Sequence, residues 1–205
     1  MVEFPDPRVS TPEGLVAIGG SWDPEILESA YRKGIFPWPQ PGLPILWFSP
    51  DPRGILEFRD LHIPHSLQKF ARKCPWVFTF NQAFVEVMNE CRKQRRPGQE
   101  GTWILPEMIP AYRQLHLRGQ ALSIECWEDG VLIGGLYGVD LKGLFSGESM
   151  FFLKPNASKM CFWKITEYLR ARGDTWMDLQ MVTDITGVFG GRYIPRDEFL
   201  RRRGV

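Results

Sequence analysis

ALSIECWEDGVLIGGLYGV, residues 121–139, is the stretch that decides the predicted fold. Two apolar segments flank Glu128–Gly130, and Asp-Gly between such segments is a strong signal for a β-hairpin. A second turn over residues 140–143 leads into GLFSGESMFF. The stretch and its continuation therefore predict a meander of antiparallel strands.

A helix and a further strand follow the meander. Asn156 is placed to cap a long helix that ends before Gly173. Its inward face is expected to carry Cys161, Ile165, Tyr168 and Leu169. WMDLQMV, residues 176–182, then has the alternation of a strand. A meander followed by a helix and a strand predicts an α+β fold with a mostly antiparallel sheet.

The first ~55 residues differ from the rest of the chain in composition, because they are rich in Pro and Gly. They contain one clear helix, with Asp23 as N-cap, Pro24 in its first turn and Gly34 beyond its end. GIFPWPQPGLPILWFSPDPRG, residues 34–54, follows, and its prolines are expected to exclude a helix and break up any strand. Its apolar flanks favour a rigid buried wall over an exposed proline-rich ligand.

The segment between these regions predicts shorter elements. They are a strand over 55–58, a basic helix over 65–73, a strand over 77–80, a helix capped by Asn81, and a helix that starts near Pro106 and ends before Gly119.

Charge and cysteine content narrow the function. With 25 Lys+Arg against 24 Asp+Glu, the net charge is +1, which argues against a protein that coats long nucleic acids. The cysteines lack metal-site or redox spacing, which predicts free thiols in a reducing compartment. We expect no metal, no membrane span and no signal peptide. We expect packing or surface roles for His62, His65 and His116.

The strongest polar pair is Asp178 and Gln180 in MDLQM. Residues two apart in a strand face the same side, so the pattern places a carboxylate beside an amide. The pair belongs either to a site or to a solvent-facing sheet edge. Glu148, in GESMFF, poses a similar choice between a turn in water and a buried anchor for a cation.

Basic residues occur in three groups. Lys69, Arg72 and Lys73 share one face of the predicted helix, a geometry that suits a few phosphates. Residues 92–96 form the second group, and residues 201–203 form a third that we expect to be frayed. The simpler interpretation of each group is a solvated surface.

Several unusual short motifs occur along the chain in this order: GIFPW, LWFSPDPRG, EGTWI, GGLYGV, LFSGESMF, NASK and the D-x-Q of MDLQM. In this order they resemble the bacterial leucyl/phenylalanyl-tRNA–protein transferases, from Gly14 to Leu200. The resemblance implies a small N-terminal α/β domain over 1–54 and a larger domain over 55–205, similar to the acyl-CoA N-acyltransferase (GNAT-like) fold.

The resemblance also implies an activity. It is the transfer of Leu, Phe or Met from aminoacyl-tRNA to the α-amino group of proteins that begin with Arg or Lys. Such products are read as N-degron degradation signals in the cytoplasm. No cofactor is implied, because the aminoacyl ester is already activated, and we expect a monomer.

Matching positions carry over individual roles. Asp178 would orient the amine and accept its proton, and Gln180 would hydrogen-bond the amine or carbonyl. Glu148 would hold the donor's α-ammonium or its hydrogen-bond network. Trp38 and Trp103 would stack at the tRNA 3′ end. Leu136 and Phe145 would line the pocket for the transferred side chain. Lys69, Arg72 and Lys73 would contact tRNA phosphates.

The chain departs from the family pattern at three positions. Ile185 and Val188 stand where the family usually has His and Ser, and Leu136 stands where Met is common. These changes bear on donor and acceptor preference. Glu125 is a candidate for acceptor choice, against the plainer interpretation of a solvated strand residue.

Two other functions fit parts of the sequence. An acetyl-CoA-dependent acetyltransferase would need a glycine-rich phosphate loop, which FFLKPNASK lacks. A non-catalytic module for RNA ends or protein N-termini would not need Asp178 and Gln180.

Overall fold

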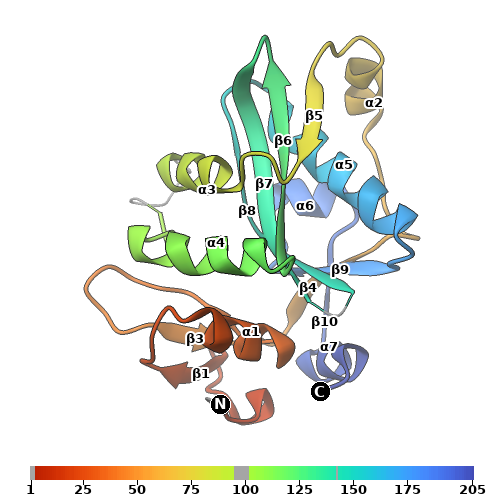
Figure 1. Ribbon diagram of the computed structural model, residues 1–205. Coiled ribbons are helices and arrows are strands. Elements are labelled where there is room, and N and C mark those ends of the chain that lie inside the picture. The colour runs from red at the N-terminus through yellow and green to blue at the C-terminus, as the bar shows by residue number, and fades with distance from the viewer. Residues whose placement is uncertain (1–2, 95–101, 142) are drawn as a thin grey trace.

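The computed structural model describes residues 3–94, 102–141 and 143–205 (Figure 1). Its strands are β1 (Leu15–Ile18), β2 (Phe36–Pro37), β3 (Leu46–Phe48), β4 (Arg53–Glu57), β5 (Val77–Phe80), β6 (Ala121–Glu128), β7 (Val131–Leu141), β8 (Leu144–Phe152), β9 (Trp176–Gln180) and β10 (Arg192–Ile194). Its helices are α1 (Pro24–Arg32), α2 (His65–Ala71), α3 (Phe84–Lys93), α4 (Ile109–Leu117), α5 (Ala157–Ala171), α6 (Asp184–Val188) and α7 (Arg196–Arg203), with 3₁₀ turns at Pro7–Val9 and Pro106–Met108.

The main sheet has seven strands in the order β10-β4-β9-β8-β7-β6-β5. All neighbouring pairs are antiparallel except β8 and β9, which are parallel and joined through α5. The α+β class and the mostly antiparallel sheet are confirmed. The β6–β7 hairpin is confirmed as well, because Asp129 and Gly130 both have positive φ, 50° and 77°, as a type I′ turn requires.

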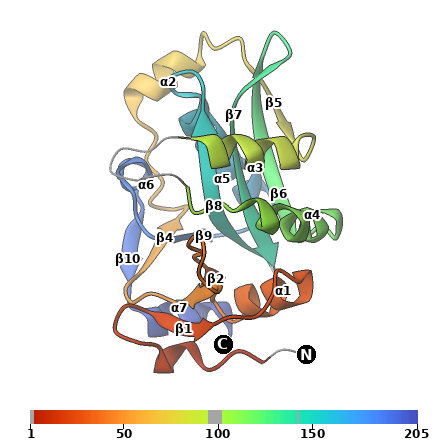
Figure 2. The ribbon, with the colours of Figure 1, turned by 90° about the vertical axis from the view of Figure 1, so that its left-hand side faces the viewer.

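Helices cover both faces of this sheet, with α3 and α4 on one face and α5 on the other (Figure 2). Two glycines of β7 allow this close packing. A Cβ on Gly134 would lie 2.5 Å from the Cβ of Ala157 in α5, and one on Gly135 would lie 2.9 Å from Val87 in α3. The paired glycines in VLIGGLYGV thus let helices approach the centre of the sheet from both sides.

The N-terminal segment forms a small sheet in the order β1-β3-β2. The expectation that its prolines would break up any strand is therefore wrong. Pro37 lies in β2 at the edge of the sheet, where a missing N–H costs least. Helix α1 is confirmed, and Gly34 beyond it has φ 74°. A domain boundary after residue 54 stays a prediction.

The flanks of the proline-rich stretch are buried, as expected. Ile35, Phe36 and Trp47 are at most 2% exposed and belong to one apolar cluster with Tyr112 and Phe151 of the larger sheet region. Helix α1 contacts α4 and β7, and the aromatic side chains of the small sheet belong to an apolar core that is shared with α3 and α4.

Three local expectations are corrected. Asn81 does not cap α3, because its side chain accepts a hydrogen bond from the Ser123 N–H. Tyr168 is 40% exposed on α5. The basic C-terminal residues are helical rather than frayed, and Arg202 pairs with Glu57 of β4 at 2.7 Å. Helix α7 is thereby tied to the sheet.

Candidate active site

A cavity of about 450 Å³ lies where β2 and the residue after it face the middle of β7, the second half of β8, the strand β9, the first turns of α5, and α6. Its apolar lining comprises Phe36, Pro37, Trp38, Trp103, Leu136, Met150, Phe152, Phe162, Met177, Leu179, Met181 and Ile185. Its polar lining includes Gln94, Glu148, Ser149, Ser158, Gln180, Thr183, Asp184 and Thr186. The cavity thus combines apolar walls with a few polar groups, as ligand sites do.

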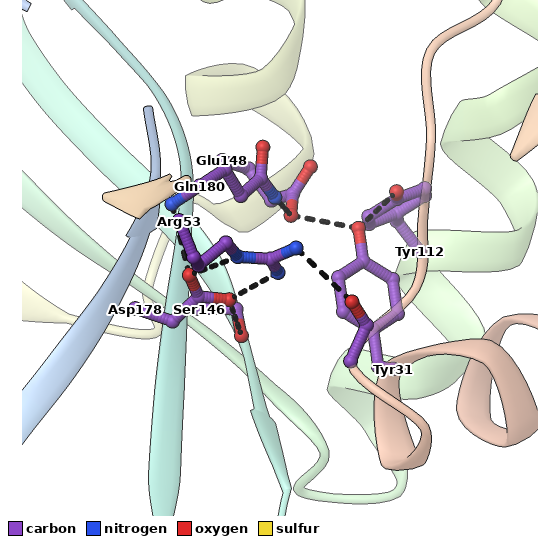
Figure 3. A network of polar contacts seen from close by, with 8 residues as sticks. Tyr31, Arg53, Tyr112, Ser146, Glu148, Asp178 and Gln180 are labelled. Atoms are coloured by element: carbon purple, nitrogen blue, oxygen red, sulfur yellow. Dashed lines mark hydrogen bonds and ion pairs between the residues drawn. The ribbon is translucent and has the colours of Figure 1, made fainter. Parts of the chain in front are cut away.

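Asp178 lies behind this cavity rather than in it. It is 1% exposed, and its two oxygens accept from Arg53 Nε at 2.8 Å and Nη2 at 2.7 Å (Figure 3). Ser146 Oγ and the Gln180 N–H donate to the same carboxylate. The expectation that Asp178 faces the substrates and takes a proton is corrected, because its lone pairs are already used by these four donors.

Gln180 ends strand β9 in the left-handed region, with φ 62°. This conformation breaks the alternation of the strand, so Asp178 and Gln180 do not lie side by side on one face. The Gln180 side chain instead lines the cavity and donates from Nε2 to Glu148 Oε1 at 2.7 Å. Neither residue is at a solvent-facing edge, since both are buried.

Glu148 lies within β8, not at a turn in water. Oε1 also accepts a 2.7 Å hydrogen bond from the Tyr31 hydroxyl, which in turn contacts the Tyr112 hydroxyl. Burial raises the pKa of Glu148 to about 8, the Tyr31 hydrogen bond opposes this rise, and the nearby Asp178 charge adds to it. Glu148 is thus a carboxyl whose protonation changes near neutral pH.

Most of the expected pocket residues line this one cavity. Trp38, Trp103 and Leu136 do so together with Glu148 and Gln180. Phe145 is corrected: it is 1% exposed and packs in the core below the cavity, among residues around Leu136. Of the two departures from the family pattern, Ile185 lines the cavity, whereas Val188 is 55% exposed and does not.

Several residues of this network escaped the sequence analysis. Tyr31 and Tyr112 occupy inward positions of helices, which indicated packing and gave no sign of their hydroxyl contacts. Arg53 stands in a turn-like PDPR, and Ser146 precedes the more conspicuous Glu148. A signal for Arg53 was available, because a buried carboxylate needs a cationic partner.

Glu125 is corrected under both interpretations. It is fully buried and accepts from Thr79 Oγ1 at 2.6 Å and Ser123 Oγ at 2.5 Å. The Ala83 N–H at the start of α3 also donates to it. Its carboxylate therefore orders the connection from β5 into α3 and is not a cavity residue.

The basic groups and histidines lie elsewhere. Lys69, Arg72 and Lys73 are exposed on and just after α2, the helix at the upper right of Figure 1. Arg95 and Arg96 lie outside the described residues. His116 stacks on Phe84 with 4.3 Å between ring centroids, a packing role as expected. Within the described residues, no cluster of His, Cys, Asp or Glu could hold a metal, and no helix could span a membrane.

Comparison with known families decides what this chain is. The model for the leucyl/phenylalanyl-tRNA protein transferase matches residues 55–203, and the model for its N-terminal domain matches residues 20–51. The chain belongs to this family. As a member it is an aminoacyltransferase, a leucyl/phenylalanyl-tRNA–protein transferase, which confirms the resemblance found in the sequence.

Curated relatives support the assignment over nearly the whole chain. The leucyl/phenylalanyl-tRNA–protein transferase of Anaeromyxobacter sp. (strain K) is 49% identical over 199 residues, covering 97% of this chain and 85% of the relative. That of Flavobacterium psychrophilum is 46% identical over 200 residues, covering 98% and 95%.

Solved structures are more distant. L-PGS from Bacillus licheniformis is 12% identical with a TM-score of 0.42, covering 76% of this chain and 49% of that one. A GCN5-related N-acetyltransferase from Kribbella flavida is 10% identical with a TM-score of 0.41, covering 81% and 58%.

Proposed function

We propose that this family member transfers Leu, Phe or Met from aminoacyl-tRNA to the α-amino group of proteins that begin with Arg or Lys. The reaction takes place in the cytoplasm and marks the products for N-degron degradation. The observation that carries the proposal is the cavity itself: apolar walls contain Trp38 and Trp103, and the paired side chains of Glu148 and Gln180 lie at its polar side.

The apolar walls suit the donor. Leu136 and Ile185 line them, and the side chains of Leu, Phe and Met all gain from burial there. An apolar pocket separates close apolar analogues by only about 1–3 kcal/mol, so more than one donor is expected. Trp38 and Trp103 offer flat indole faces, and stacking a base on such a face contributes about 1–3 kcal/mol.

The polar side suits the reacting groups. The acceptor amine attacks the ester carbonyl, an oxyanion forms, and the ribose oxygen leaves. Gln180 and Glu148 are placed to hydrogen-bond these groups. Because an α-amino group has a pKa of about 7.7–8.0, little help is needed to deprotonate it. Holding both substrates in register supplies roughly 7–11 kcal/mol of the rate enhancement.

Phosphates of the tRNA, mainly those of its acceptor end, are bound by charge. Lys69, Arg72 and Lys73 are exposed, and among the described residues none of the three has an ion-pair partner. Phosphate contacts of this kind position a nucleic acid without reading its sequence. We further propose that the enzyme acts as a monomer without a cofactor, with residues 1–54 as a distinct N-terminal domain.

The test is transfer of labelled Leu, Phe and Met from charged tRNA to peptides that begin with Arg, Lys, Ala or Asp. The proposal predicts transfer of all three to Arg and Lys peptides and little to the other two. An acetyl-CoA-dependent activity on the same peptides, or no transfer from any charged tRNA, would refute it.

A further inference from the structure

We propose that Arg53 is a positioning residue for the transfer reaction: through Asp178 it holds the backbone turn that points Gln180 into the cavity. This inference rests on the proposed function, since it explains how that site is kept in shape. Arg53 itself does not line the cavity and is 1% exposed.

The turn at Gln180 needs support. Its φ of 62° is a conformation that L-residues other than Gly, Asn and Asp rarely adopt. Two hydrogen bonds define it: the Gln180 N–H donates to Asp178 Oδ1 at 2.9 Å, and the Met181 N–H donates to the Leu179 carbonyl at 2.6 Å. The first of these depends on where the Asp178 carboxylate is held.

Arg53 fixes that carboxylate in position and in plane. Nε and Nη2 engage its two oxygens, so the fork sets both distance and orientation. The guanidinium lies between the rings of Phe36 and Phe199, 4.8 and 4.4 Å from their centroids. A lysine ammonium could keep the charge but not the planar two-point contact.

The neighbouring backbone is fitted to the same turn. Gly54, which follows Arg53, pairs with Gln180 across β4 and β9. A Cβ on Gly54 would lie 2.7 Å from the backbone carbonyl carbon of Met181. The sequence Arg53–Gly54 therefore supplies both the cation that holds Asp178 and the space in which the turn after Gln180 lies.

Arg53 also reaches the opposite wall. Its third nitrogen, Nη1, donates to the Gly34 carbonyl at 3.0 Å. Gly34 follows α1, whose Tyr31 contacts Glu148, and precedes Phe36 and the cavity residue Trp38. One guanidinium thus connects the segment that leads to Trp38 with the turn that carries Gln180.

The alternative is a purely structural ion pair that stabilises the fold without setting the site. The two roles differ in one measurable way. A residue that acts through Gln180 loses most of its effect on the rate when the Gln180 side chain is already gone, whereas independent effects on the rate multiply. Coupling between Arg53 and Gln180 therefore separates the two roles.

The experiment is a cycle of Arg53→Lys and Gln180→Ala, with kcat and KM measured for Phe transfer to an Arg-starting peptide. Arg53→Lys is expected to lower kcat on the order of 100-fold, the cost of a small misplacement, with KM nearly unchanged. In the Gln180→Ala background the same change should cost less than about tenfold. Equal losses in both backgrounds would overturn the proposal.

Arg202→Lys is the matched control, because Arg202 pairs with Glu57 on the same strand β4 but does not contact Asp178. It should leave kcat within about twofold in both backgrounds.

A second variant keeps the inference testable if Arg53→Lys misfolds or transfers too slowly to measure. Arg53→Met with Asp178→Leu removes both charges and leaves no buried ion unpaired. We expect it to fold, by circular dichroism, and to lose kcat as Arg53→Lys does. A folded double variant with wild-type kcat would overturn the inference. Absence of transfer in the wild type would instead count against the proposed function.

Discussion

Asp178 and Glu148 are two carboxylates of one network with opposite surroundings. Asp178 has a cationic partner and four donors, and it lies behind the cavity. Glu148 lines the cavity, and among the described residues its hydrogen-bond donors are the neutral side chains of Tyr31 and Gln180, both bound to one oxygen. Its other oxygen accepts no hydrogen bond among the described residues.

The difference shows that the partner, not the burial, decides what a carboxylate can do. A carboxylate paired with a cation is held in position by its partners and so serves as a support. A buried carboxylate without a cation changes protonation near neutral pH, which is the range where a reacting amine also titrates. We therefore assign structure-holding to Asp178 and the changeable proton to Glu148.

Breaking the ion pair between Arg53 and Asp178 should have the largest effect on stability. Asp178→Asn leaves Arg53 buried without a counter-charge, which costs about 3–5 kcal/mol of the free energy of unfolding. Urea unfolding measures the loss, and Asp184→Asn, at an exposed cavity carboxylate, is the control. A loss below about 1 kcal/mol would show that the ion pair is not needed for stability.

Neutralising Glu148, which has no cationic partner, should change the free energy of unfolding in a way that depends on pH. The folded-state pKa of Glu148, about 8, is raised above the ordinary glutamate value of 4.5. Its contribution to stability is therefore fully present below pH 4.5 and declines as pH rises towards 8, by at most about 1.4 kcal/mol per pH unit. Glu148→Gln should lack this decline.

The measurement is the free energy of unfolding of the wild type minus that of Glu148→Gln, from pH 5 to pH 9. This difference should fall as the pH rises. Tyr31→Phe removes a hydrogen bond that lowers the pKa of Glu148, so the decline should extend to higher pH. Tyr112→Phe is the matched control, because its hydroxyl contacts Tyr31 and not Glu148. A difference independent of pH would contradict the raised pKa.

The apolar wall near Glu148 should affect selectivity more mildly. Ile185→Ala enlarges the cavity, which should favour Phe over Leu as donor by about tenfold in the ratio of kcat/KM values. Val188→Ala, one turn further along α6 and outside the cavity, should leave the ratio unchanged. If both variants behave alike, Ile185 has no part in donor choice.

Exposed cations should have the smallest effect, in contrast to the buried Arg53. Changing Lys69, Arg72 and Lys73 to Ala should raise KM for aminoacyl-tRNA and flatten its dependence on salt, with kcat unchanged. An unchanged salt slope would place the phosphate contacts elsewhere.

The sequence predicted the β6–β7 hairpin, helix α1 and most cavity residues, because each depends on a local pattern or on a motif that is typical of the family. It failed at Asp178 and Gln180, where one left-handed residue overrides the alternation of a strand. It also missed Arg53 and Tyr31, which are 125 and 117 residues from their partners Asp178 and Glu148. Contacts at such separations depend on tertiary packing that no local pattern encodes.

The most direct test of the two-carboxylate account is a pH titration by carbon-13 NMR of protein labelled at glutamate side-chain carboxyls. Glu148→Gln identifies the resonance of Glu148. We predict that this resonance titrates near pH 8. Titration of Glu148 near the ordinary glutamate pKa of 4.5 would contradict this prediction.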